Sequence, residues 1–427
     1  MAKILIFIGA HLCTAPRPQK EAAALAQAGH EVTLCGIWFD RELAQRDQAL
    51  IADQPYRFQP ILDFRPQAGA ALQRFGIRIQ ARLAREAFRR WQAFSPALLG
   101  YGARAMYRRA RQAKADLNIF HSEAGLWAGA ALIKAGVPVG IDFEDWFSDD
   151  LLPSALATRP VAKIRQLEST LMHHCRYKLT TSHALAAAFA QAYQTAPPAV
   201  IYNAFPRSEG VAPRPSEGPI KLHWFSHTIG PGRGLETLFQ ALPAIHGSVE
   251  LHLRGNYPPS SQAWMEPLIP QAWRSRILIH PLVTNAELPH KIAEHDIGLA
   301  LETPYCGNKQ YTISNKLFQY LQSGLATIAT DTAGQREIMA QIPAAGALIP
   351  CDDPVALATA INGLGTNRDR LQAAKQAAYG AAQNAFCYET QIPTLLNALD
   401  QALAPLHKPR KQPGTLYPDG WITDATS

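Results

Sequence analysis

The residues best suited to chemistry lie in the second half of the chain, where polar side chains follow a short apolar run. Glu302 ends that run, and Ser314, Asn315 and Lys316 open a segment with apolar residues on one helical face. Ser314 is a suitable N-cap, and the first turn of such a helix presents backbone N–H groups and the positive end of its dipole. At the carboxyl edge of a parallel sheet this is a good phosphate site. An ordinary strand–helix–strand unit with a solvated lysine would show the same pattern.

A glycine-rich turn lies upstream of this segment, between a predicted strand and a predicted helix. It carries Gly230, Gly232 and Arg233. Glycines let backbone N–H groups approach a phosphate, and an arginine adds a charged, bidentate donor. Such a turn is weak evidence alone, but together with Asn315 and Lys316 it predicts a diphosphate site. Arg254 ends the next predicted strand and is a further candidate for this site.

The first half of the chain has its own cluster of polar strand ends. His121 and Glu123 follow the predicted strand 117–120, and an acidic loop with Asp142, Glu144 and Asp145 follows the next one. Parallel strands end at the same edge of a sheet, where α/β proteins bind their ligands. The acidic loop could bind substrate, bind a divalent cation, or be a solvated loop whose acids cap a helix.

Two cations precede this cluster. Arg17 and Lys20 lie where the first predicted helix, residues 19–28, begins, after the strand at residues 3–8 and a loop at 9–18. Such a pair could bind an anion, or both side chains could simply be solvated on the surface. The turn lacks the G-x-G-x-x-G pattern of a dinucleotide site.

Predicted strands and helices alternate along both halves of the chain, which indicates two Rossmann-like α/β domains. A segment rich in Pro, Ser, Glu and Arg divides them, as expected of a linker. The predicted division is as follows: residues 1–204 the first domain, 205–219 the linker, 220–385 the second domain, 386–404 a helix returning to the first domain, and 405–427 a mobile tail.

Several ordered motifs resemble the GT-B glycosyltransferases of the family 4 type, also called glycosyl transferases group 1. They are Glu302 before a loop, the stretch from Asn315 to Tyr320, the opening AGHEVTL, and the passage TTSHAL followed by VIYNAF. Gln319 stands where this family usually has a glutamate. The resemblance implies transfer of a sugar, with retained configuration, from a nucleotide-sugar on the second domain to a glycan or lipid-linked acceptor on the first, in cell-surface polysaccharide assembly.

The residue pattern and the resemblance together give an expected role for each site residue. The expected catalytic residues are His121, Asp145 and Glu302. The expected donor-binding residues are Gly230, Gly232, Arg233, Arg254, Ser314, Asn315, Lys316 and Gln319. The expected acceptor or cleft residues are Arg17, Lys20, Glu123, Asp142 and Glu144. No cofactor, metal or nucleic acid is expected. A nucleotide-sugar epimerase of similar fold and a non-catalytic partner protein with an altered site are the alternatives.

Cysteine spacing and hydropathy indicate the cellular compartment of the protein. The six cysteines are scattered without a C-x-x-C pair, which indicates reduced thiols in a cytoplasmic protein and disfavours a zinc site. No run approaches the roughly 18–20 apolar residues that span a bilayer.

The positive charge is concentrated in one segment. Residues 64–114 hold eleven arginines and Lys114 against Glu86, a net charge of +11, which leaves −4 for the rest of a chain whose total is +7. The pattern predicts two basic helices with an apolar stripe, broken near Pro96. They could pack on their own domain, contact an anionic membrane surface, or flank the cleft and steer an anionic substrate.

Overall fold

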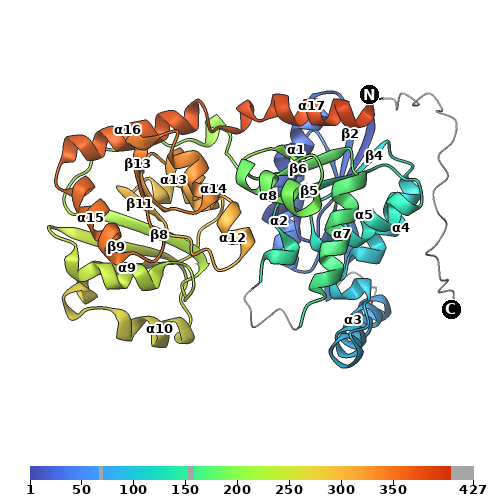
Figure 1. Cartoon of the computed structure of the whole chain (residues 1–427), viewed down its shortest axis with the longest axis horizontal. Helices are drawn as coiled ribbons and strands as arrows, with labels where there is room; N and C mark the ends of the chain where they lie inside the picture. Colours follow the sequence, from blue (N-terminus) through green and yellow to red (C-terminus); the bar gives the residue numbers. More distant parts are fainter. Residues whose placement is uncertain (67–70, 152–157, 405–427) are drawn as a thin grey trace.

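The computed structural model describes residues 1–66, 71–151 and 158–404 of the 427-residue chain. Two sheets flanked by helices stand side by side, and a long helix pair crosses from one to the other along one edge (Figure 1). Every strand pairing within the two sheets is parallel. The prediction of two Rossmann-like α/β domains is confirmed.

The first sheet has seven strands in the order β3-β2-β1-β4-β5-β6-β7. Its strands are β1 Lys3–Phe7, β2 Glu31–Trp38, β3 Arg57–Asp63, β4 Leu117–Phe120, β5 Val139–Phe143, β6 Tyr177–Thr180 and β7 Ala199–Val200. Its helices are α1 Pro16–Gln27, α2 Arg41–Ile51, α3 Ala71–Trp91, α4 Ala103–Ala113, α5 Glu123–Lys134, α7 Val161–His174 and α8 His183–Tyr193.

Burial on both faces explains why the central strands read as continuous apolar runs. Every residue of β4 and β5 is buried, as expected when helices cover both sides of a parallel sheet. Helix α1 begins at Pro16, three residues before the predicted start, because proline is tolerated in the first turn of a helix. The predicted break between two basic helices is confirmed, since α3 ends at Trp91 and α4 begins at Ala103.

The second sheet has six strands in the order β10-β9-β8-β11-β12-β13. Its strands are β8 Ile220–Thr228, β9 Val249–Asn256, β10 Ile277–His280, β11 Ile297–Ala300, β12 Ala326–Thr330 and β13 Gly346–Ile349. Its helices are α9 Leu235–Ala241, α10 Pro259–Met265, α11 Leu288–Ile292, α12 Gly307–Tyr311, α13 Asn315–Gln322, α14 Ala333–Met339, α15 Pro354–Gly365 and α16 Arg368–Gln383.

The last helix, α17 Ile392–Leu403, follows α16 and lies along the first sheet (Figure 1). Leu395 and Leu399 are buried in one cluster with Ile4 and Ile6 of β1. This is the return expected of the C-terminal helix, while the exact domain boundaries stay predictions. The predicted mobile tail, 405–427, lies outside the described residues.

A buried ion pair holds the start of the second domain together. Lys375 of α16 is 1% exposed, and its Nζ lies 2.9 Å from Oδ1 of Asp296, which precedes β11. Asp296 also accepts hydrogen bonds from the hydroxyl of Ser216 in the linker and from the backbone N–H of Lys221 at the start of β8. Helix, strands and linker are thus joined at one carboxylate.

Two predictions drawn from composition can be compared with the structure. All six cysteines are free thiols. Among the described residues, none of the helices has the length and apolar content needed to cross a bilayer.

Candidate active site

Glu302 is the centre of the polar cluster at the end of β11. Its Oε1 accepts a hydrogen bond from the hydroxyl of Ser314 at 2.8 Å and from Nζ of Lys316 at 2.7 Å. Ser314 is the N-cap residue of α13, but its hydroxyl turns to Glu302, so no side chain caps this helix. The predicted capping hydrogen bond is therefore wrong. The uncapped first turn leaves its N–H groups for another acceptor, such as a phosphate.

The environment keeps Glu302 ionised. Burial alone would raise the pKa of its carboxyl, but the charges of Lys316 and Lys309 outweigh burial and lower the pKa to about 2. Thr330 of β12 fixes the backbone here, because its Oγ1 accepts from the N–H of Glu302 at 2.8 Å and lies 2.7 Å from the Glu302 carbonyl oxygen. A carboxylate and a lysine ammonium are thus held in one place at the carboxyl edge of the second sheet.

The glycine-rich turn lies against this cluster. A Cβ on Gly234, which has φ +78°, would come within 2.4 Å of Cβ of Leu301, so only glycine fits between the turn and the strand end. The indole N–H of Trp224 donates to the carbonyl of Arg233 at 3.3 Å, and Nζ of Lys316 lies 5.8 Å from the centre of the Trp224 ring. Trp224 thus brings the turn and the start of α13 together around one ring.

The other predicted donor residues occupy three different environments. Arg233 is exposed, and its guanidinium donates to the hydroxyl of Ser226. Asn315 is exposed and Gln319, one turn further along α13, is half-buried. Arg254 is 4% exposed on β9 and donates to the carbonyl of Pro281 at 2.9 Å. Gly230 and Gly232 border open space, so a ligand could approach their backbone.

In the first domain, His121 is enclosed by two carboxylates. Its Nδ1 lies 2.8 Å from Oε1 of Glu144 and its Nε2 lies 2.5 Å from Oε2 of Glu21, with the side chain 1% exposed. Burial would lower the pKa of His121, but Glu21 and Glu144 outweigh burial and raise it to about 10. The imidazole is therefore cationic at neutral pH, and both its nitrogens face protein carboxylates. A direct contact between His121 and a substrate hydroxyl would require Glu21 or Glu144 to move away. The carboxylate of Glu144 is itself 30% exposed and is open to a substrate.

The guanidinium of Arg17 makes all its hydrogen bonds within the protein. Its Nε and one terminal nitrogen bind both oxygens of Asp142, at 2.7 and 3.0 Å, and its remaining donors bind the carbonyls of Thr180 and Ile201 and the side chain of Asn203. The alternative of a solvated surface cation is wrong for Arg17, which is 7% exposed. Its five N–H donors are all used, so the predicted anion contact would require breaking one of these bonds.

Lys20, one turn along α1, is also drawn inward. Its Nζ donates to the carbonyl of Ala204 and lies 5.1 Å from the ring centres of Phe205 and Tyr388. Burial, and then the charge of Arg17, lower its pKa to about 8. Glu123 begins α5 and pairs with Arg159.

The acidic loop of the first domain contacts Asn308 of the second domain. The side-chain nitrogen of Asn308 donates to Asp145 at 2.8 Å and to Asp150 at 2.7 Å, and its side-chain oxygen accepts from the backbone N–H of Trp146 at 2.9 Å. Asn308 is 1% exposed, although it lies between two domains. The predicted catalytic residue Asp145 is therefore placed at the domain interface, beside the loop that follows Glu302.

A second set of contacts joins the domains nearby. The carboxylate of Glu337 in α14 accepts from the backbone N–H groups of His183 and Ala184, both at 2.9 Å, and from the hydroxyl of Tyr202 at 2.6 Å. It thus caps α8 of the other domain. The hydroxyl of Ser182 donates to the carbonyl of Tyr311 at 2.6 Å.

Sequence reasoning missed two members of this site. Glu21 looks like a solvated residue in an alanine-rich helix, but it is 3% exposed and contacts both His121 and the hydroxyl of Tyr177. Its position one turn after Arg17 is the one signal that could have pointed inward. Lys309 lies between the two halves of the site, because Glu302, Asp150 and Asp145 all act to raise its pKa.

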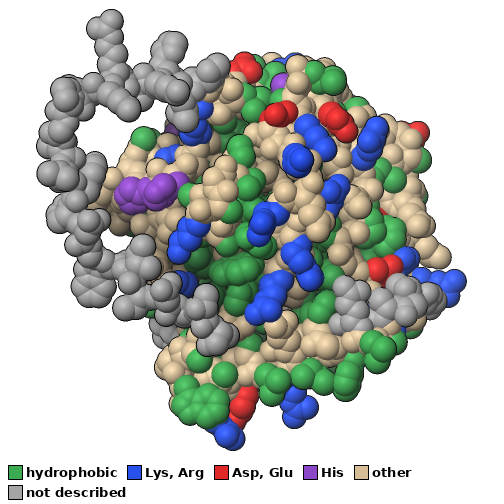
Figure 2. All heavy atoms as spheres, turned by 90° about the vertical axis from the view of Figure 1, so that its right-hand side faces the viewer, with side chains coloured by type: hydrophobic (Ala, Val, Ile, Leu, Met, Phe, Trp, Pro, Cys, Tyr) green, Lys and Arg blue, Asp and Glu red, His purple; other side chains and the backbone are tan. Residues whose placement is uncertain are grey.

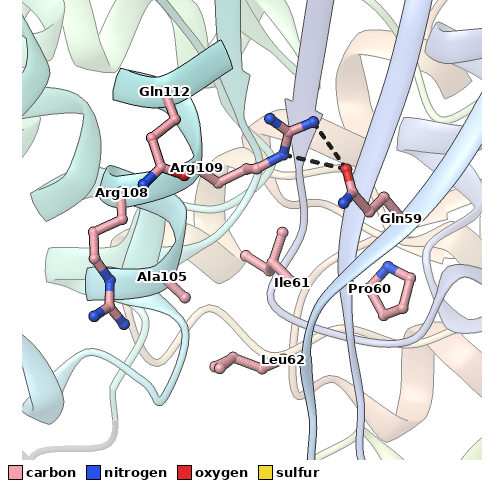
Figure 3. A pocket seen from close by; sticks show the side chains of 8 residues that line it. All are labelled: Gln59, Pro60, Ile61, Leu62, Ala105, Arg108, Arg109 and Gln112. Atoms are coloured by element: carbon pink, nitrogen blue, oxygen red, sulfur yellow. Dashed lines mark hydrogen bonds between the residues drawn. The ribbon is translucent and has the colours of Figure 1, made fainter.

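A separate groove lies between β3 and α4. It has a volume of about 410 Å³, and Arg109 spans it with two hydrogen bonds to the side-chain oxygen of Gln59, at 2.9 and 3.2 Å (Figure 3). Pro60, Ile61 and Leu62 line one side and Arg108 the other. Because β3 is the outer strand of the first sheet, this groove is separate from the cluster around Glu302.

Comparison with known proteins follows the same division of the chain. Residues 223–367 match the model of the family described as glycosyl transferases group 1. The matched region contains Glu302, Lys316 and the glycine-rich turn. A search of curated protein sequences found no significant match.

Solved structures match both domains of the chain together. Sucrose-phosphate synthase from Thermosynechococcus elongatus is 15% identical, with a TM-score of 0.69 over 94% of this chain and 99% of that one. HepE from Anabaena, in complex with UDP and glucose, is 17% identical, with a TM-score of 0.65 over 94% and 100%. A Listeria monocytogenes protein described as a UDP-N-acetylglucosamine 2-epimerase is 12% identical, with a TM-score of 0.55 over 96% and 99%. The chain therefore has the GT-B fold.

We expect Lys316 and Arg233 each to strengthen binding of a nucleoside diphosphate. Replacing either by alanine removes one charge-assisted contact, which should cost about 1.5–3 kcal/mol, or roughly 10- to 150-fold in Kd. Calorimetric titration of Lys316→Ala and Arg233→Ala with UDP and GDP measures this. Lys291→Ala removes an exposed lysine of the same domain, paired with Glu294, and is the matched control. Unchanged affinity in both site variants would contradict the prediction that the diphosphate binds at Lys316 and Arg233.

Proposed function

We propose that this protein transfers a sugar from a nucleotide-sugar to a glycan or lipid-linked acceptor in cell-surface polysaccharide assembly, with retention of anomeric configuration. The observation that carries the proposal is the convergence of the glycine-rich turn, Lys316 and Glu302 around Trp224. A cation, free helix N–H groups and a glycine turn are what a diphosphate leaving group requires. The group 1 family match over this domain supports the same chemistry.

Each part of the site has a proposed role in that reaction. Lys316 and Arg233 stabilise the negative charge that develops on the departing diphosphate. Glu302 orients the donor sugar while it holds Lys316. Across the domain interface, Glu144 and Asp145 contact the acceptor hydroxyl or the sugar, and His121 fixes Glu144 in place. No cofactor or metal takes part in this step.

Product analysis tests this function. The chain is incubated with radiolabelled UDP-, GDP- and dTDP-sugars, with and without bacterial membranes as the acceptor source. UDP-glucose is included because HepE, a similar structure, was solved with it. We expect label to move into lipid or glycan only when membranes are present, and Lys316→Ala but not Lys291→Ala to abolish the transfer.

The same experiment separates the alternatives. An altered free sugar-nucleotide formed without an acceptor would indicate an epimerase, the activity described for one structural neighbour. Absence of product with every donor would favour a non-catalytic partner protein, as Gln319 in place of glutamate would allow. Either result overturns the proposal of glycosyl transfer.

We further propose that α3 brings the enzyme to an anionic membrane surface. Leu72, Phe75, Ile79 and Leu83 follow one another at spacings of three or four residues, so they form one stripe along the helix. These four side chains are 87%, 64%, 40% and 63% exposed. Phe88 faces the opposite way, into the protein. An apolar stripe pointing away from the protein needs another partner.

Arginines flank this stripe and support an anionic partner. Arg78, Arg82 and Arg85 are all exposed along one side of α3, while Arg89 and Arg90 share Glu86. Figure 2 shows Lys and Arg side chains spread over this face of the first domain, with hydrophobic side chains along its lower edge, where α3 lies. A basic helix with an apolar stripe is the pattern of interfacial membrane helices.

A smaller groove connects the two basic helices. It is lined by residues of α3, β3 and α4, among them Ile77, Leu62, Arg104 and Arg108, and has a volume of about 150 Å³. It places Arg104 and Arg108 of α4 beside Ile77 of α3. A lipid phosphate at the surface contacted by α3 would lie within reach of these arginines.

Vesicle co-sedimentation tests the membrane proposal. Binding should require anionic lipid and should fall as salt rises, because screening acts over about 8 Å at physiological ionic strength. Removing Arg78, Arg82 and Arg85 together, as glutamines, should cost up to about 3 kcal/mol, roughly 100-fold in partitioning.

The apolar stripe is tested separately. Phe75→Ser with Leu83→Ser should reduce binding at every salt concentration, because burial of apolar surface is not screened. Val355→Ser, which changes a 72% exposed apolar side chain of the second domain, should leave binding unchanged. Failure of the unaltered protein to bind anionic vesicles at low salt would contradict the proposal.

A further inference from the structure

Four histidines gather on one face of the second sheet, away from the donor cluster. His223 lies on β8 opposite His252 on β9, His280 ends β10, and His295 lies two residues before β11. Their neighbours Leu222, Trp224, Leu251 and Leu253 belong to the main hydrophobic core of the domain, so the histidines project from the other face. His223, His252 and His295 are 0%, 7% and 3% exposed, and His280 is half-buried.

Three of these rings bring their nitrogens together. His252, His280 and His295 each offer one ring nitrogen, and these three atoms lie within 4.8 Å of one another. Nδ1 of His252 is 2.9 Å from Nε2 of His280. Zinc–nitrogen bonds of about 2.0–2.1 Å in a tetrahedron separate two ligand nitrogens by roughly 3.4 Å. The rings thus need only small rotations to share an ion.

Outer contacts orient two of the rings as in metal sites. Nε2 of His252 faces Oε2 of Glu250 at 3.3 Å, and Nδ1 of His295 faces the carbonyl of Ile292 at 3.1 Å. When Nε2 of His252 donates to Glu250, its Nδ1 carries the lone pair, and this nitrogen is the one that lies beside His280. Carboxylate and carbonyl oxygens are the usual partners of a metal-bound histidine.

The burial of His223 is a separate observation that packing does not explain. Neither of its ring nitrogens has a hydrogen-bond partner, although the residue is 0% exposed, and its ring lies 4.3 Å from that of His295. Leaving buried polar atoms unpaired is costly. Neutral imidazole is the form that binds metals, and an ion would give these buried nitrogens a partner.

The other buried group of this kind, Glu21, His121 and Asp142, does not compete as a metal site. Both oxygens of Asp142 are bound by Arg17, and Glu21 is shared by His121 and Tyr177. The carboxylate oxygens of that group are therefore already bound by protein cations and donors. The charges around the histidine cluster are mixed, because Glu250 and Glu294 are negative whereas Arg254, Lys221 and Lys291 are positive.

We propose that His252, His280 and His295 bind one divalent transition-metal ion, for which Zn²⁺ is the best match, with His223 or water as the fourth ligand. Neutral imidazoles in a partly closed site favour zinc among common biological ions. The ion would join β9, β10 and the entry to β11, and so brace the sheet that carries Glu302. The expectation of no zinc rested on cysteine spacing, whereas these histidines come from separate strands.

Metal binding is measured directly, without an activity assay. The chain is prepared without a histidine tag, freed of metal with a chelator and dialysed, and then titrated with Zn²⁺ by calorimetry and by thermal unfolding. We expect one Zn²⁺ per chain and a higher Tm with the ion. His252→Gln with His280→Gln should lower affinity at least 10-fold and abolish the Tm shift.

Two further variants separate this site from surface binding and from misfolding. His173→Gln with His174→Gln removes an exposed histidine pair of α7 and should leave Zn²⁺ binding unchanged. Glu250→Gln keeps the ligands and should weaken binding by about 10- to 100-fold, as for loss of an outer partner. Equal Zn²⁺ affinity in the His252/His280 variant and the unaltered chain, or no binding by the unaltered chain, would overturn the proposal.

Discussion

The contact between Glu302 and Lys316 is the interaction on which the site depends. A half-buried carboxylate is costly unless it is paired, and here a lysine and a serine hydroxyl at the start of α13 stabilise it. The hydrogen bond from Ser314 to the same carboxylate takes its hydroxyl away from the capping position, so the helix N-terminus stays open. One pair of charges therefore fixes the lysine, keeps Glu302 ionised and leaves N–H groups for an anion.

The second constraint is the interface between the domains. Asn308 binds two carboxylates of the acidic loop, and Glu337 caps α8 of the first domain. Because Asn308 follows Glu302 by only six residues, any movement of the acidic loop acts on the loop beside the donor cluster. Lys309 feels carboxylates from both sides of the interface. In the proposed reaction, these contacts hold the two domains in register and thereby align the two substrates.

Much of the fold could be predicted from the sequence, since strands of apolar residues alternate with helices and end in polar loops. The segment from Phe39 to Asp63, which forms α2 and β3, could not be predicted from the sequence, because β3 is an edge strand with few buried residues and a weak apolar pattern. The local motif around Glu302 and Lys316 was visible because its parts lie within fifteen residues. The buried hydrogen bonds of Arg17 and His121 could not be predicted, because their partners lie on strands and helices far along the chain. The histidine cluster was hidden for the same reason.

A crystal structure of the protein with UDP or GDP bound tests the central claim most directly. The account predicts that the diphosphate lies at the N-terminus of α13, with Nζ of Lys316 and the guanidinium of Arg233 within hydrogen-bonding distance of its oxygens and Trp224 beneath them. A nucleotide bound elsewhere, for example in the groove between β3 and α4, with Lys316 still paired only with Glu302, would contradict it.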